Sequence, residues 1–266
     1  MELKRRVALG GSYLDAANSK ICVQSIELAD AKENITAVSA AAGFGQRITG
    51  ARRDMADVVV RFSIDIKKTN LAGRAAALEA ANAWAAKATN GAWLTVNYRS
   101  ARRIWVRLVQ APGEGNLWEW TKAFSITFRA YGVPYWEDAS ASTKAIGTDD
   151  DESSDTITVA GSAPAQIEFT ALNTSGSTIN TLSITAAGKT MSFASLGLAD
   201  GETLCIDHDN GLLRIRRLTG GAYVSAMAAR TSASADDFTA LPGSVSVSYT
   251  AGGNCTVTAS WRARYL

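Results

Sequence analysis

The first half of the chain shows the alternation of apolar and polar residues that is typical of strands. Between residues 57 and 67 every second side chain is apolar, as in a strand with one buried face. Aromatic and β-branched residues, which favour pleated surfaces, recur in similar runs. We therefore predict strands over residues 20–28, 57–67, 92–98, 104–110 and 119–131.

One segment of this half has helical spacing instead. Residues 70–88 are rich in alanine, which has the lowest cost of helix formation. Asn70 is a good N-cap, and Gly91 follows the segment, where glycine accepts the left-handed conformation that ends helices. We predict one helix, with Leu78 and Trp84 on the face that plugs a sheet or barrel.

The second half reads as short strands separated by turn residues. The turn at 209–211 contains Asn-Gly, the strongest hairpin signal in the chain. Seven strands at this spacing predict a β-sandwich. The predicted strands are 166–170, 182–186, 189–193, 203–206, 212–216, 244–249 and 254–264.

Residues 139–158 differ from both halves, because they are small, polar and acidic without periodic apolar positions. We predict a solvated linker there, between a barrel domain at 1–138 and a sandwich domain at 159–266. The acidic run at 149–152 lacks the glycine and the spaced acceptors of a calcium loop, so we interpret it as solvated charge.

The charge distribution supports that boundary. The net charge is +2, but residues 1–138 contain 19 Lys/Arg against 13 Asp/Glu (+6), and residues 139–266 contain 8 against 12 (−4). Because the basic residues are interleaved with acids, we expect no sequence-specific nucleic-acid partner. We also expect no membrane association, because the alanine-rich run contains charged residues and no signal-peptide pattern follows Met1.

No reactive centre emerges from the residue types. The single histidine, His208, lies at a predicted turn, and we expect it to be exposed. Cys22, Cys205 and Cys255 form no metal-binding spacing; we expect all three reduced and buried, with a Cys205–Cys255 disulfide as the alternative. No nucleophile elbow or phosphate-binding loop is found, so we predict that the protein is not an enzyme and has no cofactor.

Aromatic and basic residues of the first half are the candidates for contacts between subunits. Trp93 and Trp105 fall in alternating strands, where we expect them in the core. Trp118 and Trp120 would face one side, and the arginine pairs at 52–53 and 102–103 would form ion pairs across a subunit boundary, with solvated faces as the alternative. The candidate contact residues are Phe44, Arg52, Arg53, Arg102, Arg103, Trp118 and Trp120.

The order of these features resembles the distal tail protein family of long-tailed, siphovirus-type bacteriophages. The resembling residues in the first half are the helix at 70–88, Leu108-Val109-Gln110, residues 120–128 and residues 131–138 with their Pro-aromatic pair. Those in the second half are residues 161–167, 198–207, Leu241-Pro242-Gly243, Tyr249, Gly252-Gly253-Asn254 and residues 261–266.

The resemblance implies a mainly β fold, with an N-terminal split β-barrel containing one α-helix and a C-terminal galectin-like β-sandwich. It implies a structural role at the phage tail tip, in a virion made in the bacterial cytoplasm. Copies would form a ring, expected to be a hexamer, that joins the tail tube protein to the tail-associated hub protein, with receptor-binding or fibre proteins as further partners.

Two alternatives stay open. One is a carbohydrate-binding module of a tail or cell-surface assembly, which needs an exposed aromatic residue such as Trp261 beside polar groups. The other is a tail tube protein with an added domain. In the ring hypothesis, residues 29–56 form an extended loop or hairpin that orders on contact with an adjacent ring.

Overall fold

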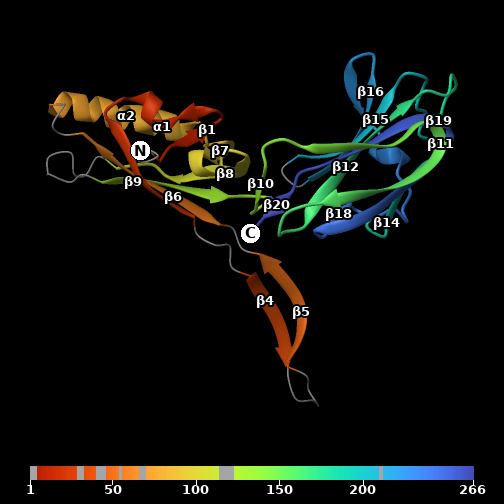
Figure 1. The fold of residues 1–266 in the computed structure, drawn as a ribbon, viewed down its shortest axis with the longest axis horizontal. Helices are drawn as coiled ribbons and strands as arrows, with labels where there is room; N and C mark the ends of the chain where they lie inside the picture. Colours follow the sequence, from red (N-terminus) through yellow and green to blue (C-terminus); the bar gives the residue numbers. More distant parts are fainter. Residues whose placement is uncertain are drawn as a thin grey trace. The chain divides into compact units, whose positions relative to one another are not determined.

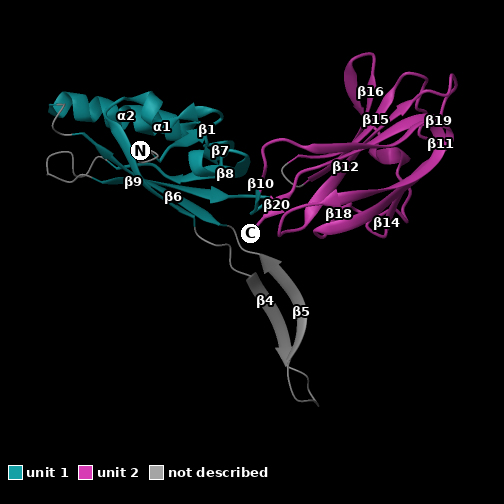
Figure 2. Cartoon of the chain, in the orientation of Figure 1, with its two compact units in different colours: residues 1–136, 266 teal, residues 137–265 magenta. Residues whose placement is uncertain are grey.

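The structure is a computed structural model, and it describes residues 5–28, 33–39, 46–53, 56–65, 70–113, 123–209 and 212–266. For 33–39 and 46–53 it describes the backbone alone. The chain divides between Trp136 and Glu137 into two compact units, which Figure 2 distinguishes by colour. The mainly β fold class is confirmed, because strands dominate both units (Figure 1).

Unit 1 contains a curled sheet of antiparallel strands with two helices against it (Figure 1). The strand order along the sheet is β2-β1-β7-β8-β9-β6-β3. Its two ends approach each other, since the Arg5 guanidinium, just before β1, donates to the Gln24 carbonyl on β3 at 3.0 Å. The strands are β1 (Val7–Leu9), β2 (Ser12–Tyr13), β3 (Ile21–Leu28), β6 (Asp57–Ile64), β7 (Ala92–Val96), β8 (Arg102–Gln110) and β9 (Phe124–Ala130).

The predicted helix is α2 (Leu71–Ala86), and the short α1 (Leu14–Ala17) is an addition that the sequence pattern did not indicate. The Asn70 side chain caps α2 by accepting the Gly73 N–H at 2.9 Å, as predicted. The buried Leu78 and Trp84 face the sheet, where Trp84 meets Phe128 of β9 edge to face. A 3₁₀ turn, η2 (Asn97–Arg99), connects β7 to β8.

Between β3 and β6 the chain forms a hairpin of β4 (Glu33–Ser39) and β5 (Gln46–Arg53). These two strands pair with each other and with no other described strand. A two-stranded ribbon is marginally stable by itself in water. The pairing of β4 with β5 confirms the predicted hairpin within 29–56. Its ordering on contact with a neighbour stays a prediction.

Unit 2 is a β-sandwich built from a second nine-stranded sheet. Its buried core includes Phe169 and Phe238, whose rings meet edge to face with centroids 5.0 Å apart. The strands are β11 (Ser142–Val159), β12 (Ala165–Asn173), β13 (Leu182–Ala186), β14 (Lys189–Phe193), β15 (Thr203–Asp209), β16 (Leu212–Thr219), β17 (Ala222–Ser225), β18 (Thr239–Ala240) and β19 (Gly243–Trp261). The short β10 (Trp136–Asp138), β20 (Arg264–Tyr265) and 3₁₀ turn η3 (Met227–Ala229) complete the elements.

The segment predicted as an acidic linker is strand β11, so the linker prediction was wrong. β11 pairs along its length with β19 and with no other described strand, which makes it an edge. Because its outer side faces solvent, only Ile146, Ile157 and Val159 are buried apolar residues, too few for a recognisable alternation. Exposed charge on an edge strand also opposes pairing with other chains.

The turn expected at Gly252-Gly253, between the predicted strands 244–249 and 254–264, is likewise absent, because β19 runs without interruption through both glycines. The first part of β19 pairs with β13, and the second part pairs with β12. A Cβ atom at Gly252 would lie 2.8 Å from the Thr181 hydroxyl. Glycine is needed there for close packing, not for reversal of the chain.

Candidate functional site

The candidate contact residues fall into three groups. Phe44, Trp118 and Trp120 lie outside the described residues, and Arg52 and Arg53 are described only as backbone at the end of β5. Arg102 and Arg103 begin β8 and are half-buried. The structure therefore gives side-chain geometry for the second arginine pair alone.

Arg103 belongs to a cluster on the outer face of β7 and β8, the face opposite the buried side chains Leu94, Ile104 and Val106. Its guanidinium lies over the Trp93 ring, 3.8 Å from the centroid. The Trp93 and Trp105 rings meet edge to face, with centroids 5.1 Å apart. The exposed Arg107 shares this face and lies 5.9 Å from the Tyr131 ring centroid. We call Trp93, Arg103, Trp105 and Arg107 the arginine–tryptophan strip.

The expected core position of Trp93 and Trp105 was wrong, since both are half-buried on the outer face. The sequence did indicate this position, because the residues that alternate with the two tryptophans are the aliphatic ones that fill the interior. They are Leu94, Ile104 and Val106. Gly91, with φ at +100°, holds the strip in place. A Cβ atom there would lie 2.6 Å from the Trp105 ring, so only glycine lets the indole lie against this turn.

Two ion pairs occupy the same face beyond the strip. The Arg129 Nε atom on β9 lies 2.6 Å from the Asp57 carboxylate on β6, and this hydrogen-bonded guanidinium lowers the pKa of Asp57. Arg61 on β6 similarly binds Glu27 on β3 at 2.7 Å and lowers the pKa of Glu27. These carboxylates are engaged with their own arginines.

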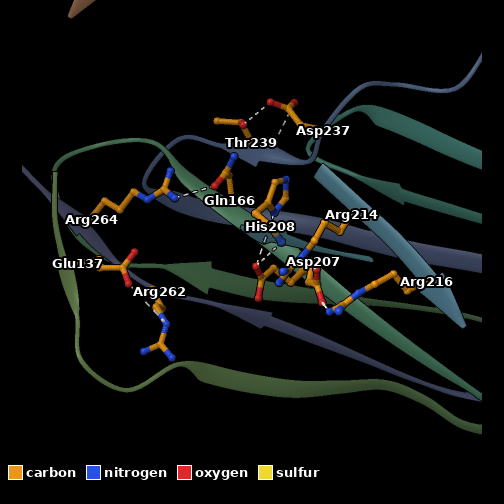
Figure 3. A network of polar contacts seen from close by, with 11 residues as sticks. Glu137, Gln166, Asp207, His208, Arg214, Arg216, Asp237, Thr239, Arg262 and Arg264 are labelled. Atoms are coloured by element: carbon orange, nitrogen blue, oxygen red, sulfur yellow. Dashed lines mark hydrogen bonds and ion pairs between the residues drawn. The ribbon is translucent and has the colours of Figure 1, made fainter. Parts of the chain in front are cut away.

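Unit 2 carries a polar network on the outer face of β15 and β16 (Figure 3). Asp207 accepts the Arg214 Nε–H at 2.8 Å and is also bound by Arg216, so one carboxylate joins two guanidiniums. Arg216 in turn lies over the exposed Tyr223 ring, 4.1 Å from its centroid. Because the charges are matched among themselves, this network reinforces the pairing of β15 with β16 and offers no reactive group.

The expectation that His208 is an exposed turn residue was wrong. His208 lies in β15, and its side chain is only 4% exposed. Its ring nitrogens have no hydrogen-bond partner among the described residues, and the Glu168 carboxylate lies 3.6 Å from Nδ1. β15 continues past the predicted strand end and carries the imidazole to its inner face, opposite Leu213.

The carbohydrate hypothesis finds little support in unit 2. Trp261, which the sequence offered as the aromatic platform, is buried, and so is Tyr249. Tyr223 is 56% exposed, but the Arg216 guanidinium lies against its ring. None of these three rings is therefore presented as an open platform of the kind that a sugar requires.

Unit 1 contains a cavity of about 380 Å³ lined by Arg5, Ile26, Asn97 and Tyr98.

In the described ranges no group of three or more His, Cys, Asp or Glu side chains is arranged to hold a metal ion. None of the described helices combines the length and apolarity needed to cross a membrane.

Solved structures of proteins from phage adsorption and baseplate assemblies share this fold. The Dit protein of phage SPP1, described as a paradigm of the hub adsorption apparatus in phages that infect Gram-positive bacteria, aligns with a TM-score of 0.70 and 14% identity. The alignment covers 98% of this chain and 99% of that chain. The chain has the Dit fold.

Two further structures carry the same fold. Chains of the phage P2 baseplate in its activated conformation, with Ca and with Sr, align at TM-scores of 0.53 and 0.51, each with 6% identity. They cover 98% and 97% of this chain, respectively. No protein-family model matches the sequence, and no curated protein matches it significantly. The Dit fold is thus preserved at identities too low for sequence comparison.

Within the Dit fold the three cysteines differ in accessibility. All three are free thiols, but Cys22 is exposed on β3, so the expectation that all are buried was wrong for this residue. Burial raises the pKa of the Cys205 thiol, and it raises the pKa of the Cys255 thiol to about 11.

We expect one thiol per native chain, that of Cys22, to react rapidly with a thiol-specific reagent at pH 8. Cys205 and Cys255 should react only on unfolding, because burial keeps them protonated and inaccessible. Absorbance measurements with an aromatic disulfide reagent would count the thiols. Fast labelling that persists in Cys22→Ser would contradict the assignment.

Proposed function

We propose that this protein is a structural component of a phage tail tip, a distal tail protein. Copies of it form a ring, taken to be a hexamer, that joins the tail tube to the hub and adsorption apparatus. The supporting observation is the alignment of both units with the SPP1 Dit protein over nearly the full length of each chain. In this proposal the protein is a virion component and does not act as an enzyme.

The strand edges agree with an assembling protein. In unit 1, β2 and β3 end the sheet path, and the β4–β5 hairpin has neither edge covered by another described strand. Unpaired strand edges present rows of backbone donors and acceptors that a neighbouring chain can complete. Identical subunits joined by such heterologous contacts form a closed ring when the rotation between them closes.

The test is direct observation of the assembly. The purified chain should give annular particles with six-fold symmetry in negative-stain images and the mass of six chains in native mass spectrometry. The measurement should be repeated with the tail tube and hub proteins of the same virion, because rings can close on their partners. A chain that remains monomeric alone and with both partners would contradict the proposal.

A further inference from the structure

Strand β17 is an open edge of unit 2. It ends the sheet path, and among the described strands it pairs with β16 alone. All four of its residues are exposed, and they are Ala222, Tyr223, Val224 and Ser225. The strand is uncharged, contains no proline and pairs with β16 without a register shift. It therefore lacks the charge, the proline and the bulge with which proteins commonly protect an edge.

Two other edges of unit 2 are protected. β14, at the opposite end of the path, is covered by the segment after η3, because Thr231 and Ala235 donate their N–H groups to carbonyls of this strand at 2.9 and 2.8 Å. β11 carries the exposed acidic residues at 149–152, so a second copy of β11 laid against it would bring like charges together. Of these three edges, β17 is the one suited to contact another copy.

The unused backbone groups of β17 belong to Tyr223 and Ser225. The Ala226 N–H donates to the Ile215 carbonyl on β16 at 2.9 Å, so the backbone groups of Ala226 face β16. Successive residues of an antiparallel strand direct these groups alternately to its two sides. Those of Val224 thus face β16 as well, whereas those of Tyr223 and Ser225 point to the open side. In the described ranges, no backbone hydrogen bond outside the strand ladders involves either residue.

The two arginines of β16 that lie opposite β17 have carboxylate partners within the chain. Arg216 is bound by Asp207 (Figure 3), and Arg217 lies 3.9 Å from the Glu202 carboxylate. If two copies joined at β17, their arginines would be separated by three strand spacings, about 14 Å. This separation exceeds the Debye length of about 8 Å at physiological ionic strength, so repulsion between them is largely screened.

We propose that β17 of one copy pairs antiparallel with β17 of a second copy, around a two-fold axis at Val224. In this register Tyr223 lies opposite Ser225 of the second copy, and both residues use their outward N–H and C=O groups. The Val224 side chains of the two copies meet on one face of the joined sheet, and Tyr223 packs beside Ser225 on the other. A slip of one residue would set the aromatic ring against the wrong face.

The contact is isologous, so it closes on two copies and does not propagate around a ring. The inference therefore goes beyond the proposed ring and does not depend on it. Pairing at β17 doubles the mass of the species that the chain otherwise forms, whether that species is a ring or a single chain. The main-chain hydrogen bonds of an added strand supply the affinity, as in other cases of strand addition.

Charge substitution at Val224 tests the contact. Val224→Lys and Val224→Glu each bring two like charges together across the two-fold axis, so each variant alone should associate through this edge about tenfold or more weakly. A mixture of the two should associate at least about fivefold more tightly than either variant alone, because opposite charges directly across paired strands attract. Sedimentation velocity and native mass spectrometry measure the masses.

The matched control is Leu212→Lys. Leu212 is an exposed apolar residue of β16 that lies beyond the part of β16 paired with β17. The substitution adds the same charge to the same sheet, and it should leave association unchanged.

Self-cross-linking gives a direct geometric readout. Val224→Cys in a Cys22→Ser background places identical thiols opposite each other in a non-hydrogen-bonded pair. The Cα atoms of such a pair are about 4.5 Å apart, which a disulfide can span. Chains of this one variant should form covalent dimers with a mild oxidant, whereas Leu212→Cys chains in the same background should not.

A proline substitution tests the backbone contribution separately. Ser225→Pro removes an outward N–H group and leaves the ladder between β16 and β17 intact, since proline is tolerated where the N–H of an edge strand faces solvent. It should weaken association while circular dichroism shows that unit 2 is still folded.

The outcomes separate this inference from the proposed function. Val224→Cys chains that fail to cross-link, or that cross-link no more than Leu212→Cys chains, would overturn the inference whether or not rings form. Specific cross-linking of chains that never form rings would support the β17 contact and contradict the ring. Val224→Lys chains that keep their mass but lose binding to the tail tube or hub protein would overturn the inference, because the edge would then serve another protein.

Discussion

Replacing Trp84 by alanine is expected to destabilise unit 1 by about 3–5 kcal/mol. Trp84 is 2% exposed, and its ring packs edge to face against Phe128 with centroids 6.0 Å apart. Its Nε1–H also donates to the Ser12 carbonyl at 2.7 Å, which fixes the hairpin of β1 and β2 against α2. The substitution removes the largest side chain between helix and sheet and leaves a cavity.

Hydrogen exchange followed by mass spectrometry in urea would resolve the effect by unit. Peptides of unit 1 should exchange at lower urea in Trp84→Ala. Trp84→Phe keeps the ring and loses only the hydrogen bond, so its effect should be smaller. Glu79→Ala, at an exposed position of the same helix, should change the free energy of unfolding by no more than about 0.5 kcal/mol. Equal effects of Trp84→Ala and Glu79→Ala would refute the packing role assigned to Trp84.

Replacing Asn173 by aspartate is expected to destabilise unit 2 by about 2–4 kcal/mol. The buried Asn173 amide uses its full hydrogen-bonding capacity. Its Nδ2 donates to the carbonyls of Ser177 and Leu198 at 2.7 and 2.8 Å, and its Oδ1 accepts the Ser175 N–H at 2.9 Å and the Ser175 hydroxyl at 2.8 Å. Aspartate loses both donors and turns negative charge toward two carbonyl oxygens.

The loss of stability in Asn173→Asp should depend on pH with a definite sign. A carboxyl in this place favours its protonated form in the folded state, so its folded pKa lies above its unfolded pKa. The deficit should therefore be smallest below the unfolded pKa of about 3.9, where the group is protonated in both states, and grow as pH rises. Urea unfolding at pH 4 and pH 7 would measure it.

The matched control is Asn254→Asp, the same chemical change at an exposed position of β19. Asn254 makes a side-chain hydrogen bond to the Asp149 carbonyl. Because water can replace this bond, the control should cost no more than about 1 kcal/mol. If both variants lose equal stability, Asn173 does not have the structural role described.

Local signals in the sequence predicted most of the elements. Asn70 caps α2 because its side chain satisfies an N–H of the first turn, which requires no distant partner. The alternation over 57–67 predicted β6, since burial of one sheet face imposes a period of two. Ala187-Gly188 reverses the chain between β13 and β14, with positive φ at both residues.

The wrong predictions concern segments whose conformation depends on neighbours from distant parts of the chain. β11 has too few apolar residues to be recognised, and its strand form depends on pairing with β19, about 100 residues later. Gly252 resembles a turn residue until Thr181 is placed beside it. His208 resembles an exposed turn residue until β15 is extended by pairing with β16.

The same distinction between local and long-range signals applies to the candidate contact surfaces. The sequence by itself determined the types of element, the two-part organisation and the opposite charges of the halves, because these follow from periodicity and composition. Only the tertiary structure brought Trp93, 12 residues before Trp105, into contact with it and with Arg103. That contact depends on strand register, which is set by the sum of many weak pairings across the sheet and is not encoded at any one position.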